Sequence, residues 1–206
     1  MKDDNSSIFI IDDDEPIRRS ISLLLNASGY ATESFAGVEE FLETVDYSGA
    51  GCILLDIFLE GKSGLELQEE IKSKFQCLPI IYITGMGDVP MSVQALKKGA
   101  VNFLQKPIDE RQLLDTIEEA LHLSHQMVME QKETSRIRSL IGNLTPREYE
   151  IFKYLITGML NKQIAAELNI TEHTVKLHRG KITEKLGVKS VAEIVQMAGK
   201  LNLFSI

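Results

Sequence analysis

The chain has 206 residues, of which 44% are hydrophobic and 25% are charged, and this composition is typical of a folded globular protein. No apolar run approaches the roughly 18 residues that a membrane-spanning helix needs, and the first residues lack the basic and apolar order of a signal peptide, so we expect a cytoplasmic protein with no membrane partner. The net charge of −8 is unevenly distributed along the chain. Residues 1–123 carry 10 Lys and Arg and 22 Asp and Glu, whereas residues 124–206 carry 12 Lys and Arg and 8 Asp and Glu. An acidic half followed by a basic half indicates two domains with different partners.

Strand-like apolar runs alternate with amphipathic segments throughout residues 1–123. The apolar runs predict strands at 8–11, 30–34, 52–55, 80–83 and 101–104. The amphipathic segments predict helices near 16–28, 38–46, 64–75, 89–98 and 109–121. Five such repeats predict an α/β fold, in which a doubly wound five-stranded parallel sheet carries helices on both faces.

Charged and hydroxyl side chains follow the predicted strands. Asp12 and Asp13 come after the first strand, Asp56 after the third, Thr84 after the fourth and Lys106 after the fifth. Ligands of such sheets bind just beyond the carboxyl ends of the strands. Carboxylates gathered there repel one another unless a cation offsets their charge, and a hard divalent cation with oxygen ligands fits best. The sequence therefore predicts a Mg²⁺ site formed by the three aspartates, with Thr84 and Lys106 on its rim.

Each of these residues has a simpler interpretation when it is taken alone. Asp13 or Asp14 could serve only as the N-cap of the first helix, and Asp14 is the better candidate for that role. Lys106 could be a solvated charge and Thr84 a turn hydroxyl. Their occurrence as a set at successive strand ends favours the metal site.

Four segments of this part resemble the receiver domain of two-component systems over about residues 5–123. They are "IIDDDEP", "LLDIFLEGKSGLEL", "YITGMGDVPMSVQALKKGA" and "NFLQKP". The resemblance implies that Asp56 accepts a phosphoryl group from a sensor histidine kinase, and that Lys106 and the Thr84 hydroxyl hold its oxygens. It implies as Mg²⁺ ligands Asp12, Asp13, Asp56 and the backbone carbonyl of Phe58.

The resemblance also implies a conformational switch. When Thr84 closes on the phosphoryl group, the space that it leaves can be filled by Phe103, which stands where the family has its switch aromatic. Gly85 leaves room for the phosphoryl group to enter, and the Lys106–Pro107 bond is a candidate cis peptide. The face formed by the fourth helix and fifth strand would then mediate homodimerisation. The alternative is that Phe103 is a plain core residue.

The helix near 109–121 continues into a polar segment without Gly or Pro before residue 142. Its apolar stripe runs through Leu113, Ile117 and Leu121, and the following residues are mostly polar. We therefore predict a receiver domain over 1–123, a helical linker over 124–142 and a second domain over 143–206.

The second domain begins with strong helix signals. Thr145, Pro146 and Glu148 predict a capped helix start, and Asn161 is expected to cap the next helix. Thr171 predicts the start of a longer helix, "EHTVKLHRGKITEKLG", that ends at Gly187. Short helices joined by a tight turn predict a helix-turn-helix, whose second helix enters the DNA major groove.

The long helix divides into a core face and an exposed face. Val175, His178, Ile182 and Leu186 recur at helical spacing and are expected to be buried, with His178 as a packed side chain. The other face carries cations suited to phosphates and base edges, and an apolar side chain suited to a thymine methyl group. The predicted DNA-contacting residues are Lys176, Leu177, Arg179, Gly180 and Lys181, with Lys162 on the preceding helix. The alternative is a merely solvated basic face.

The segment "LTPREYEIFKYLITGMLNKQIAAELNITEHTVKLHRGKITEKLGVKS" resembles the LuxR-type DNA-binding domain, a small all-α domain of four helices. Together with the receiver-like part, the chain resembles the NarL/FixJ group of response regulators, and FixJ-type regulators most. The resemblance implies a transcription factor that binds promoter DNA as a phosphorylated dimer, with RNA polymerase as a possible partner and without enzymatic activity of its own. It matches Lys176, Leu177 and Gly180 to groove-facing positions of the family.

Two other functions remain open from the sequence. A phosphatase of the haloacid-dehalogenase type also uses a strand-end aspartate with Mg²⁺, but it needs a second acid two residues later, where this chain has Phe58. An adaptor would instead use its C-terminal helices to bind another protein. Salt-dependent DNA binding would distinguish a regulator from an adaptor.

Overall fold

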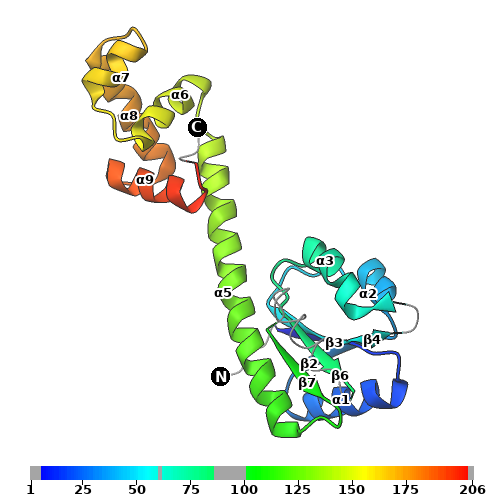
Figure 1. Ribbon diagram of the computed structural model, residues 1–206. Coiled ribbons are helices and arrows are strands. Elements are labelled where there is room, and N and C mark those ends of the chain that lie inside the picture. Colours follow the sequence, from blue (N-terminus) through cyan, green and yellow to red (C-terminus); the bar gives the residue numbers. More distant parts are fainter. Residues whose placement is uncertain (1–5, 60–61, 86–100, 204–206) are drawn as a thin grey trace. The chain divides into compact units, whose positions relative to one another are not determined.

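The computed structural model describes residues 6–59, 62–85 and 101–203 (Figure 1). Packing divides the chain into two compact units, Met1–Met129 and Glu130–Ile206. The helix predicted at 89–98 lies outside the described residues. The predicted domain boundaries at 123 and 143 stay a prediction.

The first unit contains a parallel sheet with the strand order β2-β1-β3-β6-β7. Its strands are β1 (Ser7–Ile11), β2 (Ala31–Phe35), β3 (Gly51–Asp56), β6 (Ile80–Thr84) and β7 (Asn102–Gln105). A separate antiparallel pair, β4 (Phe58–Leu59) and β5 (Lys62–Ser63), follows β3. The five strands lie where the sequence predicts them, and the doubly wound order is confirmed.

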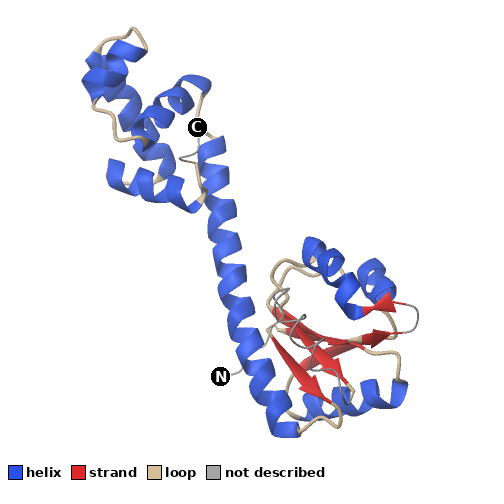
Figure 2. Cartoon of the chain, viewed as in Figure 1, coloured by secondary structure: helices blue, strands red, loops and turns tan. Residues whose placement is uncertain are grey.

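Helices cover both faces of the sheet (Figure 2). Alternate residues of each strand point to opposite faces, so that Phe9 packs with α2 (Val38–Thr44) and α3 (Gly64–Lys74). Ile10 packs on the other face with α1 (Glu15–Ala27) and α5 (Glu110–Gly142). Because both faces are covered, the central strands β1, β3 and β6 are apolar at nearly every position, whereas the edge strand β2 is polar and exposed at most of its positions.

The turn between β1 and α1 is fixed by a helix cap. The Asp14 side chain accepts a hydrogen bond from the Ile17 backbone N–H at 3.2 Å, and a proline lies in the first turn of α1. Asp14 is therefore the N-cap, as predicted, and Asp13 is left to project from the end of β1.

Helix α5 is one helix of 33 residues, and it includes both the predicted helix near 109–121 and the segment 124–142 that was predicted as a helical linker. The fully buried Ser124 hydroxyl accepts a hydrogen bond from the Gly51 backbone N–H at 2.9 Å and donates one to the Cys77 carbonyl. Ile137 and Ile141 are buried in the core of the second unit. The segment 124–142 is thus helical throughout, and its buried apolar side chains, Val128, Ile137 and Ile141, belong to packed cores.

The second unit completes its fold with four further helices. These are α6 (Pro146–Ile156), α7 (Asn161–Glu167), α8 (Glu172–Leu186) and α9 (Val191–Lys200). Thr145 and Glu148 form the predicted capping box of α6, Thr171 caps α8, and Gly187 ends α8 in the left-handed conformation with φ of +65°.

The prediction that Asn161 caps α7 is wrong. Leu160 is the N-cap, and its backbone N–H donates to the Gln163 side chain at 2.8 Å, while Asn161 is the first helical residue. The Asn161 side chain is engaged elsewhere, since it accepts a hydrogen bond from Arg179 of α8. In the part of the chain that the structure describes, no helix is long and apolar enough to cross a membrane.

Candidate metal centre and nucleic-acid interface

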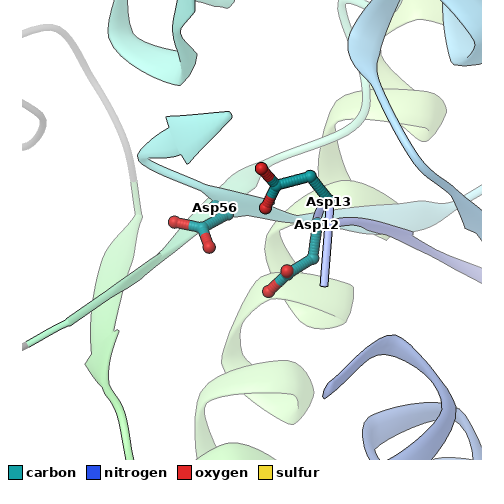
Figure 3. Close-up of side chains that lie close together, drawn as sticks. All are labelled: Asp12, Asp13 and Asp56. Carbon is teal, nitrogen blue, oxygen red and sulfur yellow. The ribbon is translucent and has the colours of Figure 1, made fainter. Parts of the chain in front are cut away.

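Three aspartates meet at the carboxyl edge of the sheet (Figure 3). Asp12 and Asp13 follow β1 and Asp56 ends β3, and these strands are direct neighbours with Ile11 opposite Leu55. One carboxylate oxygen from each aspartate lies within 4.8 Å of the others. Asp12 and Asp56 are buried, whereas Asp13 is exposed. The structure therefore brings together the aspartates that the sequence predicts at one site.

Lys106 joins two of these aspartates. Its ammonium lies 2.8 Å from Asp12 Oδ2 and 2.6 Å from Asp56 Oδ2. Lys106 follows β7, its backbone N–H donates to the Thr84 carbonyl at 2.8 Å, and the peptide bond to Pro107 is cis, as predicted. The lysine thus supplies one positive charge to two buried carboxylates.

The charges at the site influence one another. Burial raises the pKa of Asp12, although hydrogen bonds from Lys106 and from the Asp14 N–H favour its charged form. Burial alone would lower the pKa of Lys106, but its hydrogen bonds with Asp12 and Asp56 outweigh burial and raise it. Lys106 therefore stays protonated, and its single positive charge does not balance the two negative charges of Asp12 and Asp56.

The backbone holds both buried carboxylates in place. Asp12 Oδ1 accepts from the Asp14 N–H at 2.9 Å, and Asp56 Oδ1 accepts from the Phe58 N–H at 2.9 Å. Arg18 of α1, which the sequence reasoning missed, donates from Nη1 to the Asp12 carbonyl at 2.5 Å. The position of Arg18 in the first turns of α1, close in sequence to Asp12, is the sequence feature from which this contact could have been predicted. This donor set consists of oxygens with uncompensated negative charge, and it fits a hard divalent cation such as Mg²⁺.

The remaining predicted residues of this site lie around it. Thr84 is buried at the end of β6, and its hydroxyl donates to the Gly85 carbonyl at 3.3 Å. Among the described residues, no atom lies within 4 Å of the place where a Gly85 side chain would begin. Phe103 is half-buried on β7 and packs against the core shared with α2 and α3, while the Phe58 side chain is 51% exposed.

In the second unit, α8 presents most of the predicted DNA-contacting residues to solvent. Lys176, Gly180 and Lys181 are exposed, and Leu177 is 56% exposed although it is apolar. Val175, Ile182 and Leu186 are buried beneath them, while His178 is half-buried. Lys162 is exposed on α7.

Arg179 differs from these residues because it is half-buried and engaged within the protein. Its Nη1 donates to Asn161 Oδ1 of α7 at 2.8 Å. The guanidinium is therefore directed to a neighbouring helix, in contrast to the exposed basic side chains of Lys176 and Lys181.

Comparison with known proteins gives two family matches. Residues 8–118 match the response regulator receiver domain, and residues 142–198 match the bacterial regulatory proteins of the luxR family. The response regulator protein TodT of Pseudomonas putida is 39% identical over 201 residues, which cover 98% of this chain and 88% of TodT. The transcriptional regulatory protein FixJ of Bradyrhizobium diazoefficiens is 32% identical over 198 residues, or 96% and 97% of the two chains. The solved structure of the response regulator StyR superimposes with a TM-score of 0.80 at 40% identity, covering 95% of this chain and 98% of StyR.

Proposed function

This chain belongs to the DNA-binding response regulators that combine a receiver domain with a LuxR-type domain, and we propose that phosphorylation of Asp56 by a sensor histidine kinase controls its binding to promoter DNA. The observation that carries the proposal is the contact of Lys106 with both Asp12 and Asp56, at 2.8 and 2.6 Å. A strand-end carboxylate held between a backbone N–H and a lysine is an oriented nucleophile with a cation ready for the incoming negative charge. We place this reaction in the cytoplasm, where kinase and promoter are both accessible.

Asp56 attacks the phosphorus as a carboxylate, so it needs no general base. The Phe58 N–H orients one of its oxygens, and the other oxygen faces Lys106. A new O–P bond forms as the P–N bond to the kinase histidine breaks. Lys106 and the Thr84 hydroxyl then bind the transferred oxygens, and their positions suit this role, since Thr84 ends β6 and Lys106 directly follows the neighbouring strand β7.

The proposed metal ligands are Asp12, Asp13, Asp56 and the backbone carbonyl of Phe58. When bound, Mg²⁺ would neutralise charge on the carboxylates and on the phosphoryl oxygens. The gathered oxygens of the three aspartates support this assignment. Asp13, which is exposed, offers its carboxylate from the solvent side.

We further propose that the phosphorylated chain binds DNA as a homodimer through α8, and that Phe103 responds to the movement of Thr84. The half-buried state of Phe103 on β7 supports this assignment. Lys162, Lys176, Leu177, Gly180 and Lys181 form the proposed DNA-binding surface, and RNA polymerase is a further partner. The phosphatase alternative is not favoured, since the two family matches are a response regulator receiver domain and the luxR family of bacterial regulatory proteins, and the relative FixJ is a transcriptional regulatory protein. We therefore assign no catalytic turnover to the chain.

Transfer of label from acetyl phosphate tests the acceptor. Asp56→Asn should lose Mg²⁺-dependent labelling, because an amide is a far weaker nucleophile than a carboxylate. Asp14→Asn is a matched control: it changes the same chemical group two residues from Asp12, and asparagine can still cap α1. Full labelling of Asp56→Asn would show that another residue is the acceptor.

A further inference from the structure

We propose that Arg179 and Asn161 act as a positioning pair for DNA recognition. Their hydrogen bond fixes the N-terminal half of α8 against α7, and thereby sets the orientation in which α8 presents Lys176, Leu177 and Gly180 to the bases. The inference rests on the proposed role of α8 in binding DNA. It gives Arg179 a different role from the phosphate contact that the sequence predicts.

The pair joins the two helices of the helix-turn-helix directly. Arg179 Nη1 lies 2.8 Å from Asn161 Oδ1, and both residues are half-buried. Asn161 is the first residue of α7 and is not its cap, so its side chain is free of the usual capping role and serves as an acceptor for Arg179. A hydrogen bond with a charged donor is directional and stronger than a neutral one.

The other contacts of α8 near its N-terminal half are mainly apolar. Val175, Ile182 and Leu186 are buried, but apolar contacts are not directional. Within the described residues, two other side chains of α8 form hydrogen bonds with residues outside the helix. Thr174 bonds to the neighbouring cap residue Thr171 at 2.8 Å, and Lys185 donates to Glu148 at 2.6 Å and to the Asn143 carbonyl at 3.3 Å. Lys185 holds the C-terminal end of α8. The Arg179–Asn161 bond therefore provides the polar restraint next to the proposed base-contacting residues.

The two possible roles of Arg179, positioning α8 and contacting a phosphate, predict different effects of replacing Asn161. If Arg179 bound a phosphate independently, Asn161 would matter little to it. If the pair positions α8, loss of either side chain allows the same reorientation, and loss of both adds nothing further. Misorientation would weaken contacts with the preferred bases and spare the general attraction to phosphates.

The test compares two DNA duplexes over a range of salt concentrations. One is selected by the phosphorylated wild-type chain from a randomised pool, and the other has the same composition in scrambled order. Asn161→Ala and Arg179→Ala should each weaken binding to the selected duplex about tenfold, and the double variant should be no weaker than either. Affinity for the scrambled duplex should stay close to that of wild type, and so should the salt slope, which is the slope of log K against log salt concentration. The control variant Lys132→Ala, which removes an exposed charge of α5, should behave like wild type in both measurements.

The phosphate-contact alternative predicts another pattern and would overturn the proposal. Arg179→Ala would then weaken both duplexes alike and reduce the magnitude of the salt slope by about 0.9, while Asn161→Ala would behave as wild type. Asn161→Asp guards against misfolding, since it keeps an acceptor for Arg179. It should retain the ratio of selected to scrambled binding, and loss of that ratio in a chain with normal thermal unfolding would also overturn the proposal.

Lys176→Ala separates this inference from the proposed function. If Lys176→Ala loses selectivity whereas Asn161→Ala keeps it, the positioning pair is refuted and the DNA-binding role of α8 stands. If the wild-type chain selects no duplex, or Lys176→Ala retains full selectivity, the role of α8 fails and the inference with it. Loss of selectivity in all of Lys176→Ala, Asn161→Ala and Arg179→Ala supports both.

Discussion

Lys106 stands at a point where two buried carboxylates need a cation. Its ammonium contacts Asp12 and Asp56, and the Asp12 side chain is completely buried. Burial and mutual repulsion would both destabilise these carboxylates if the lysine were absent. A metal ion bound beside Asp13 would neutralise the same negative charge. Lysine and metal are therefore partly interchangeable in stabilising the fold, although they have separate roles in phosphoryl binding.

Lys106→Met tests this exchange, because methionine keeps an unbranched stem and loses the charge. Without Mg²⁺, the free energy of unfolding should fall by about 1–3 kcal/mol, since two buried acceptors lose a charged donor. Saturating Mg²⁺ should then stabilise the variant more than it stabilises wild type, because the metal takes over the neutralisation. Urea unfolding followed by circular dichroism measures both quantities.

Arg111→Met provides the control for Lys106→Met, since it removes an exposed cation of α5. Its unfolding should match wild type with and without Mg²⁺. If Mg²⁺ raised the free energy of unfolding equally in wild type and in Lys106→Met, this would contradict the idea that the lysine and the metal neutralise the same charge.

Sequence reasoning at the residue scale succeeds where topology alone brings residues together. The aspartates and Lys106 could be grouped because parallel strands share one carboxyl edge. Arg18 could not, since its contact with the Asp12 carbonyl depends on how α1 lies against β1. Arg179 was assigned to the exposed face of its helix, but its partner Asn161 comes from another helix, and no local pattern reveals that contact.

Among the elements, α5 combines two structural roles. Its turn at Ser124 is bound to the first residue of β3 through the Gly51 N–H and to the loop before β6 through the Cys77 carbonyl. Further along, Ile137 and Ile141 are buried in the core of the second unit. Between them, residues 130–136 include no buried side chain. The polar composition of the middle of the helix predicts a helical linker over 124–142, whereas the burial of Ser124, Ile137 and Ile141 depends on tertiary packing that the local pattern does not show.

Helix ends were predicted well where the signal is local. Thr145, Thr171 and Gly187 act as the sequence indicates, because each bond closes within a few residues. Asn161 fails as a cap because a charged donor from α8 competes for its side chain. Local chemistry therefore predicts most helix boundaries of the second unit, and tertiary competition explains the exception.

Glu148 couples α6 to α8 in a pH-dependent manner. The hydrogen bond from Lys185, aided by that from the Thr145 N–H, holds the pKa of Glu148 at about 2, below its ordinary value of 4.5. Because this pKa is lowered on folding, the stabilisation is complete above pH 4.5 and is lost as the pH falls towards 2. Glu148→Gln should destabilise α6 by about 1 kcal/mol at neutral pH and approach wild type in acid.

Hydrogen exchange of the α6 amides in the full chain measures this difference as a function of pH, since it reports opening of that helix alone. Glu184→Gln, an exposed position of α8, serves as the control and should follow wild type throughout. A constant difference between Glu148→Gln and wild type from neutral pH to pH 2 would contradict the role of the charge.

For the whole molecule, the distribution of charge limits how phosphorylation can act on DNA binding. Residues 1–123 already carry a net charge of −12 and residues 124–206 a net charge of +4. A phosphoryl group adds about −1.5 to −2 to the acidic part, so its direct electrostatic effect opposes attraction to DNA. A gain in affinity on phosphorylation must therefore come from another source, and dimerisation supplies one by joining two basic surfaces on the same duplex.

The chain treated with acetyl phosphate and Mg²⁺ should sediment as a dimer at concentrations where the untreated chain is a monomer. Binding to a duplex with two half-sites should then tighten by at least about 10²-fold, whereas a duplex with one half-site should gain little, since only the first can engage both protomers. Asp56→Asn should show neither change, which separates phosphorylation from any effect of the reagent. An equal gain on the two duplexes, without a change in sedimentation, would mean that phosphorylation acts within a single chain, and dimerisation would then have no part in the control of DNA binding.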